Sequence, residues 1–97
     1  MKRLRFSPKA LADLAAIHAY ISDDSPAAAK RVVRTIIGAM ARLKPFPHSG
    51  RKGLVNATSE LVVPKLSFIV VYIVVRDTVK IIAIVHVTRN ERNRDIK

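Results

Sequence analysis

The side chains of this chain that could do chemistry are mostly cationic. Eighteen Lys and Arg stand against seven Asp and Glu, which gives a formal net charge of +11. Arg51 and Lys52 fall in a glycine-flanked loop, and Arg89, Arg92 and Arg94 follow the last apolar run. Such arginines can contact phosphates or an acidic protein surface, and can stabilise a phosphoryl-transfer transition state without a metal. A solvated basic surface is the competing interpretation. The excess charge favours acidic partners, either nucleic acid or protein.

Other chemistries find little support in the sequence. The three histidines, His18, His48 and His86, have no metal-ligand spacing, and the acidic residues are dispersed. Cysteine is absent, which excludes disulfides and thiolate chemistry, and the three glycines form no phosphate-cradling loop. We therefore expect neither a metal nor a cofactor. His86, shortly before Arg89, remains a candidate, although a strand histidine bonded to a neighbouring carbonyl would account for it equally well.

The first half of the chain predicts a short strand and a helical hairpin. Residues 3–6 alternate basic and apolar side chains, which is typical of an edge strand. Ser7-Pro8 is a helix-start signal, and apolar residues then recur at helical spacing over residues 8–23. Ser25-Pro26 starts a second amphipathic helix of about 18 residues. Because the link between the two helices is short, we expect them to lie antiparallel.

The second half predicts strands that are apolar on both faces. Leu61–Val63 is a short strand, and the runs 68–75 and 79–87 are joined by a turn over 76–78. A half-buried strand should alternate apolar and polar residues, but these runs do not. The sequence therefore predicts an α+β fold of order β-α-α-β-β-β, with a helical hairpin packed on one face of a small, mostly antiparallel sheet. Two helices can cover one face, so we expect another polypeptide to cover the other.

Length and composition place the chain in a class. With 97 residues, 49% hydrophobic and 26% charged, it is long enough for one globular domain over 1–97, of which 89–97 is a basic tail. No apolar stretch reaches the roughly 20 residues that span a bilayer. No apolar segment of a secretory signal follows the basic start. We therefore expect a cytoplasmic protein that does not enter a membrane.

An ordered set of short motifs carries a family resemblance. The motifs are Ser7-Pro8-x-Ala10-x-x-Asp13-Leu14, Pro26-x-Ala28-Ala29, Leu43-x-x-Phe46-Pro47-x-x-Gly50-Arg51, Glu60-Leu61-Val62-Val63 and Val79-x-Ile81-x-x-Ile84-x-His86-x-x-Arg89. Each motif alone is weak, but together they cover nearly all of the chain and resemble the ParE branch of the RelE/ParE toxin superfamily. The chain departs from that branch at Ser59, where Arg is usual before the glutamate.

The resemblance implies the toxin half of a type II toxin–antitoxin module. Members are neutralised by a cognate antitoxin, a partly disordered, acidic protein that folds a C-terminal segment over the toxin, so the implied state is a hetero-oligomer. ParE-type members inhibit growth by binding DNA gyrase and trapping its cleaved DNA complex. They need no catalytic constellation of their own, which agrees with the scarcity of catalytic groups here. The implied protein is thus a gyrase inhibitor and not an enzyme.

RelE-type members imply the alternative, a ribosome-dependent endoribonuclease that cuts messenger RNA. They use Lys and Arg side chains with a tyrosine near the C-terminus, whereas this chain has Pro64-Lys65 at a corresponding arginine position and no aromatic residue in its tail. A ribonuclease of this kind would be metal-independent and would use Lys65, His86, Arg89 and Arg92. A third possibility is a module without toxicity that only binds an acidic protein or nucleic acid.

Two groups of residues follow from this interpretation. The residues predicted to face the target are Arg51, His86, Arg89, Arg92 and Arg94. The residues predicted to face the antitoxin are exposed apolar positions of the sheet among Phe68, Val70, Tyr72 and Ile82. Alternation alone cannot choose the correct sheet face, because both faces are apolar.

Replacing Arg89 and Arg92 by Ala is expected to weaken the toxin. Removing two cations that follow the final strand should reduce growth arrest on induction, while antitoxin binding, assigned to the apolar positions, should stay nearly unchanged. Growth curves and co-purification with the antitoxin measure the two effects. Full growth arrest by the double variant would remove both arginines from the target-binding group.

Overall fold

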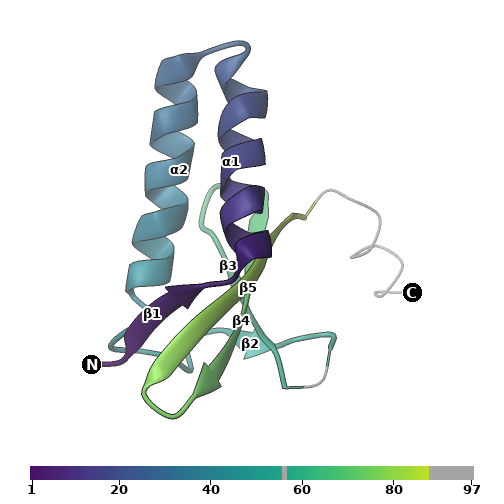
Figure 1. Cartoon of the computed structure of the whole chain (residues 1–97). Helices are drawn as coiled ribbons and strands as arrows, with labels where there is room; N and C mark the ends of the chain where they lie inside the picture. Colours follow the sequence, from purple (N-terminus) through teal and green to yellow (C-terminus); the bar gives the residue numbers. More distant parts are fainter. Residues whose placement is uncertain (56, 88–97) are drawn as a thin grey trace.

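The computed structural model describes residues 1–55 and 57–87, and Figure 1 shows two helices standing on a twisted sheet. In chain order the elements are β1 (Arg3–Phe6), α1 (Pro8–Ser22), α2 (Pro26–Ala41), β2 (Arg51–Lys52), β3 (Ser59–Val62), β4 (Phe68–Val75) and β5 (Thr78–His86). The strands form one sheet of order β1-β5-β4-β3-β2. β1 runs parallel to β5, and the other pairs are antiparallel. The predicted α+β architecture is confirmed, with β2 as one strand that the sequence had placed in a loop.

Both predicted helix starts are confirmed by hydrogen bonds. Ser7 and Ser25 are N-caps whose hydroxyl oxygens accept from the backbone N–H of Ala10 and Ala28, and each is followed by a proline at the first helical position. The side-chain oxygen satisfies an amide that has no partner inside the helix. Figure 1 shows the helices antiparallel, with the turn between them far from the sheet. The hairpin therefore touches the sheet mainly through its base.

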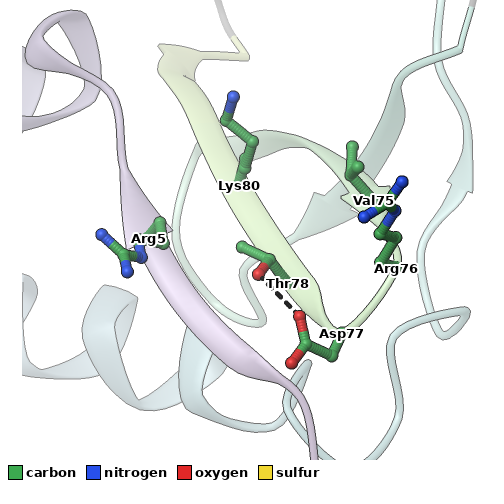
Figure 2. A pocket seen from close by; sticks show the side chains of 6 residues that line it. All are labelled: Arg5, Val75, Arg76, Asp77, Thr78 and Lys80. Atoms are coloured by element: carbon green, nitrogen blue, oxygen red, sulfur yellow. Dashed lines mark hydrogen bonds between the residues drawn. The ribbon is translucent and has the colours of Figure 1, made fainter.

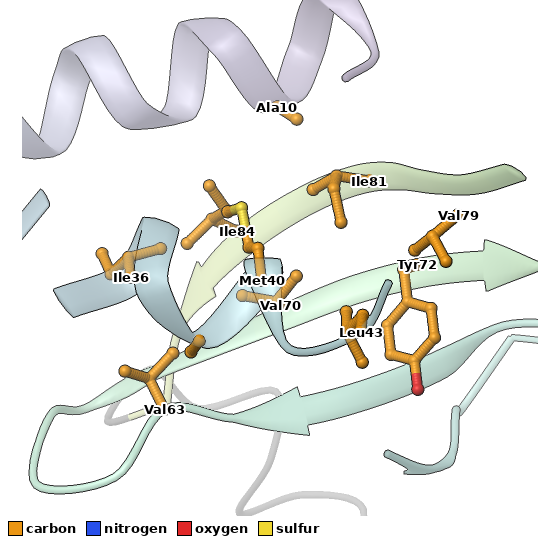
Figure 3. Close-up of a cluster of buried hydrophobic side chains, with 11 residues drawn as sticks. Ala10, Ile36, Met40, Leu43, Val63, Val70, Tyr72, Val79, Ile81 and Ile84 are labelled. Carbon is orange, nitrogen blue, oxygen red and sulfur yellow. The ribbon is translucent and has the colours of Figure 1, made fainter. Parts of the chain in front are cut away.

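The helices cover one face of the sheet, and Figure 3 shows the side chains that meet there. Ile36, Met40 and Leu43 come from α2 and the residues after it, and they pack against Val70 and Tyr72 of β4, all fully buried. On β5 the inward side chains are those of Val79, Ile81 and Ile84. The register explains this set, since Val70 pairs with Ile84, Tyr72 with Ile81 and Val74 with Val79.

A bulge in β5 changes which residues face the helices. The pairing with β4 shifts between Val71 and Tyr72, whose partners are Ala83 and Ile81, so that Ile82 is an extra residue. An extra residue reverses the alternation of side chains beyond it. Ile84 therefore joins Ile81 in the core, although strict alternation would place the two on opposite faces.

Beyond the end of β1, residues at the start of α1 supply the hydrogen-bond partners of β5. β1 pairs with β5 as far as Ile81. Past that point Ser7 Oγ donates to the carbonyl oxygen of Ile82 at 2.8 Å, and the amide of Ile84 donates to Asp13 Oδ2 at 2.9 Å. Backbone groups at a sheet edge need partners when water is excluded. Ser7 and Asp13 thus supply from a helix the hydrogen bonds that a strand would supply.

Replacing Ser7 by Ala should destabilise the protein more than replacing Ser25 by Ala. Both changes remove an N-cap, at about 1 kcal/mol. Only Ser7→Ala also removes the bond to Ile82, and a hydrogen bond of this kind is worth about 1 kcal/mol more. Urea denaturation followed by circular dichroism measures both free energies of unfolding. Equal losses in the two variants would contradict the role of Ser7 at the edge of β5.

Candidate functional site

The loop between α2 and β2 is held by one tyrosine from the core. Tyr72 is fully buried, and its hydroxyl donates to the carbonyl oxygen of Pro47 at 2.9 Å and accepts from the amide of Gly50 at 3.0 Å. Gly50 leaves no room for a side chain, because a Cβ there would lie 2.5 Å from the Tyr72 hydroxyl and 2.8 Å from the carbonyl oxygen of Glu60. The path of the loop that precedes Arg51 is therefore fixed by a polar atom at the end of a buried ring.

A buried carboxylate holds the next segment. Glu60 on β3 is 6% exposed, and Arg51 lies opposite it in the register of β2 and β3. Arg51 Nη2 and Nε each lie 3.4 Å from Glu60 Oε1, and the amide of Leu54 donates to Oε2 at 3.3 Å. A buried carboxylate must be paired or hydrogen-bonded, so this arrangement orders the segment around β2.

Arg51 thus makes a structural ion pair and is also accessible at the surface. Its side chain is 49% exposed even though it pairs with Glu60, so part of the guanidinium can still meet a partner. Target binding by Arg51 stays a prediction. The predicted His86 lies at the end of β5, where its ring packs edge-on against that of Phe68 with centroids 5.0 Å apart. These two residues lie on different elements and contact different neighbours. Arg89, Arg92 and Arg94 lie outside the described residues.

The other candidate groups are dispersed over the fold. Lys65 lies in the turn between β3 and β4 with a φ of 67°, and it shares a shallow hollow with Gly38 and Arg42 beside α2. His18 and His48 are exposed, on α1 and in the loop before β2. In residues 1–55 and 57–87, no three His, Cys, Asp or Glu side chains are grouped as metal ligands. Among the same residues, no helix has the length and apolar character needed to cross a bilayer.

The residues predicted to face the antitoxin do not form an exposed surface. Val70 and Tyr72 are fully buried under the helices, and Phe68 packs partly buried against the same core. The expectation that Val70 and Tyr72 are exposed was wrong, because β4 turns these positions towards α2. Ile82, the extra residue of the bulge, is half-buried. Antitoxin binding at Phe68 and Ile82 stays a prediction.

The helix-free face of the sheet exposes a different set of apolar side chains. Val62, Val75 and Val85 are 47%, 47% and 37% exposed, while Val71 and Ile73 between them are half-buried. The expected apolar second face is therefore present but only partly open. Val71 and Ile73 lie at its centre, and the charged residues Glu60 and Lys80 lie directly opposite them on the neighbouring strands.

Comparison with known proteins assigns the chain to a class. Its fold is similar to that in a structure titled "Chromosomal ParDE TA system from P. aeruginosa", with a TM-score of 0.74 and 27% identity, over 90% of this chain and 97% of that one. It is also similar in fold to the intact RelBE toxin–antitoxin complex of E. coli, with a TM-score of 0.68 and 14% identity, over 92% and 100% of the two chains. The fold is that of the RelE/ParE toxins.

Sequence similarity identifies the family within that class. Residues 4–94 match the family model described as the ParE toxin of type II toxin–antitoxin system, parDE. A curated protein of Sinorhizobium fredii named "Putative toxin Y4kP" is 42% identical over 85 residues, which are 88% of each chain. The chain therefore belongs to the ParE toxin family, and the resemblance inferred from its motifs is confirmed.

Sequence reasoning missed the residues that hold the loops. Tyr72 carries the only side-chain polar atom in the run Phe68–Val75, and that could have indicated an anchoring hydroxyl. Glu60 is the only acid beside the predicted strand at 61–63, and a strand acid next to apolar residues often has a buried partner. The pairing of Glu60 with Arg51 depends on the register of two strands, which single residues do not indicate.

Two glycine substitutions should have opposite effects on stability. Gly50→Ala places a Cβ against Tyr72 and Glu60, so the loop must shift, and the free energy of unfolding should fall by about 1–3 kcal/mol. Gly38→Ala on α2 meets no atom within 4 Å and should raise it by up to about 1 kcal/mol. Urea denaturation measures both. A Gly50→Ala variant as stable as the parent would contradict the tight anchoring of this loop.

Proposed function

We propose that this protein is a toxin that stops growth by binding DNA gyrase in the cytoplasm, without catalysing a reaction of its own. Membership of the ParE family supports this target, because inhibition of gyrase is what the ParE branch implies. A binding mode of action needs a stable surface and no arrangement of acid, base and nucleophile. The described part of the chain has such a surface.

The observation that carries the proposal is the placement of the groups that the ribonuclease alternative would use. A metal-independent ribonuclease needs cations and a proton-transferring group converging on one phosphate. Here Lys65 lies beside α2, whereas the ring of His86 packs on that of Phe68. The remaining two residues of the alternative, Arg89 and Arg92, lie outside the described residues. The arrangement favours binding over cleavage.

An acidic antitoxin is the second proposed partner. The structures similar to this one are titled as a ParDE system and a RelBE toxin–antitoxin complex, and a net charge of +11 suits an acidic ligand. The exposed apolar side chains on the helices, Leu11, Tyr20 and Ile37, are 55%, 80% and 43% exposed. Together with the valines of the helix-free face they offer apolar anchors on both sides of the molecule. A partner that wraps the toxin would bury both sets in one hetero-oligomer.

Purified toxin should inhibit negative supercoiling by purified gyrase. If it traps the cleaved complex, linear DNA should accumulate when detergent and protease are added to the reaction. Gel electrophoresis of plasmid DNA measures both effects, and toxin mixed beforehand with its antitoxin is the control that should restore supercoiling. Normal supercoiling at a large excess of folded toxin would contradict the proposed target.

The ribonuclease alternative and the gyrase proposal predict different effects of the same substitutions. Lys65→Gln and His86→Gln remove the described groups that could take part in cleavage, so a ribonuclease should lose growth arrest and transcript cuts in both. A gyrase inhibitor should retain growth arrest in Lys65→Gln, and induced cells should show no new transcript ends. Mapping of transcript ends after induction separates the two. Cuts that disappear in these variants would establish the alternative.

A further inference from the structure

A basic hollow lies at the β4–β5 turn, on the helix-free face of the sheet. It has a volume of about 410 Å³ and is lined by Arg5, Val75, Arg76, Asp77, Thr78 and Lys80. Figure 2 shows Lys80 and Thr78 on β5, between Arg5 on β1 and Val75 and Arg76 at the end of β4. Three separate segments of the chain thus bring cationic side chains to one place.

Two of these cations are held side by side by the fold. Arg5 pairs with Lys80 in the parallel register of β1 and β5, so their side chains project from the same face of the sheet. Like charges directly opposite each other on neighbouring strands destabilise a sheet. Among the described residues no carboxylate forms an ion pair with Arg5, Lys80 or Arg76. An anion bound between them would remove the repulsion.

Asp77, the one acid in the lining of the hollow, already has other interaction partners. Asp77 Oδ1 accepts from the hydroxyl of Thr78 at 3.2 Å, and Asp77 Oδ2 lies 4.0 Å from Arg3 Nε. Lys2 Nζ donates to the carbonyl oxygen of Arg76 at 2.6 Å, which adds another cation to the same end of the sheet. This end of the molecule is therefore strongly positive, and Arg5, Arg76 and Lys80 are exposed to solvent.

We propose that the hollow formed by Arg5, Arg76 and Lys80 binds phosphates of a DNA backbone. Arginine forks and a lysine ammonium are the side chains that hold phosphate oxygens, and each phosphate contact of this kind releases counterions from the duplex. This inference deepens the proposed function, on which it rests for its partner: a toxin that traps the cleaved gyrase complex works beside the DNA that gyrase holds.

The lining of the hollow favours a phosphate over an acidic peptide. A peptide segment gains most of its affinity from apolar anchors that fill pockets, and the charges at the rim add specificity. Val75 is the only apolar side chain in this lining, and it is 47% exposed. The other five residues of the lining are polar or charged. A DNA backbone, by contrast, needs only cations and hydroxyl or amide donors.

The test measures binding of a short fluorescent DNA duplex to the toxin alone, by anisotropy between about 50 and about 200 mM salt. The triple variant Arg5→Gln, Arg76→Gln, Lys80→Gln should bind at least about tenfold more weakly at the lower salt, and the slope of log affinity against log salt should flatten by about three. The matched control is Lys30→Gln, Arg31→Gln, Arg34→Gln, which removes the same charge from the exposed side of α2. The control should keep most of the affinity and slope.

Several outcomes would overturn the inference. No binding by the parent toxin at the lower salt would do so, as would equal losses in the two triple variants, since the charge would then act without a defined site. Tighter binding to an RNA duplex of the same length would overturn the assignment to DNA. Weaker binding to the antitoxin, with DNA binding unchanged, would assign the hollow to an acidic protein. Because gyrase is absent from this experiment, its result is distinct from failure to inhibit supercoiling.

Discussion

The structure depends on two central strands that are apolar on both faces but are covered by helices on one. β4 and β5 lie in the middle of the sheet, and the hairpin buries Val70, Tyr72 and Ile84 against α2. The bulge at Ile82 makes this possible. If residues 81–84 alternated regularly, the small Ala83 would point towards the helices and Ile84 would point away from them. The bulge thus places the larger side chain in the core and the smaller one on the helix-free face.

The same arrangement explains how a small domain holds long loops in place. The ring of Tyr72 belongs to the core, yet its hydroxyl reaches the loop at Pro47 and Gly50. Glu60, buried on β3, holds Arg51 and the amide of Leu54. Both anchors are buried. Each fixes a segment whose own side chains, including Phe46 and Leu54, are exposed. Exposed loop residues are therefore positioned by buried groups.

The sequence predicted the local features and the fold class, but it could not assign the faces of the sheet. Ser7 and Ser25 were identified as caps because a serine followed by a proline matches the residue preferences of the first two positions of a helix. Alternation usually shows which side of a strand is buried, and in β4 both sides are apolar. Val70 and Tyr72 were therefore expected on a partner surface and are in the core. Arg51 was found from its type, whereas its bond to Glu60 depends on strand register.

The sequence gives the net charge, but only the fold shows where on the surface the cations gather. The cations of this chain are scattered along the sequence, and those of α2 alternate with apolar residues as on any solvent-facing helix. The sheet brings Arg5 and Lys80, which are far apart in the sequence, to directly opposite positions on neighbouring strands. At physiological salt, charges interact over about 8 Å, so only cations gathered within such a distance act on one ligand. A high net charge thus favours acidic partners in general, and strand pairing determines where on the surface they can bind.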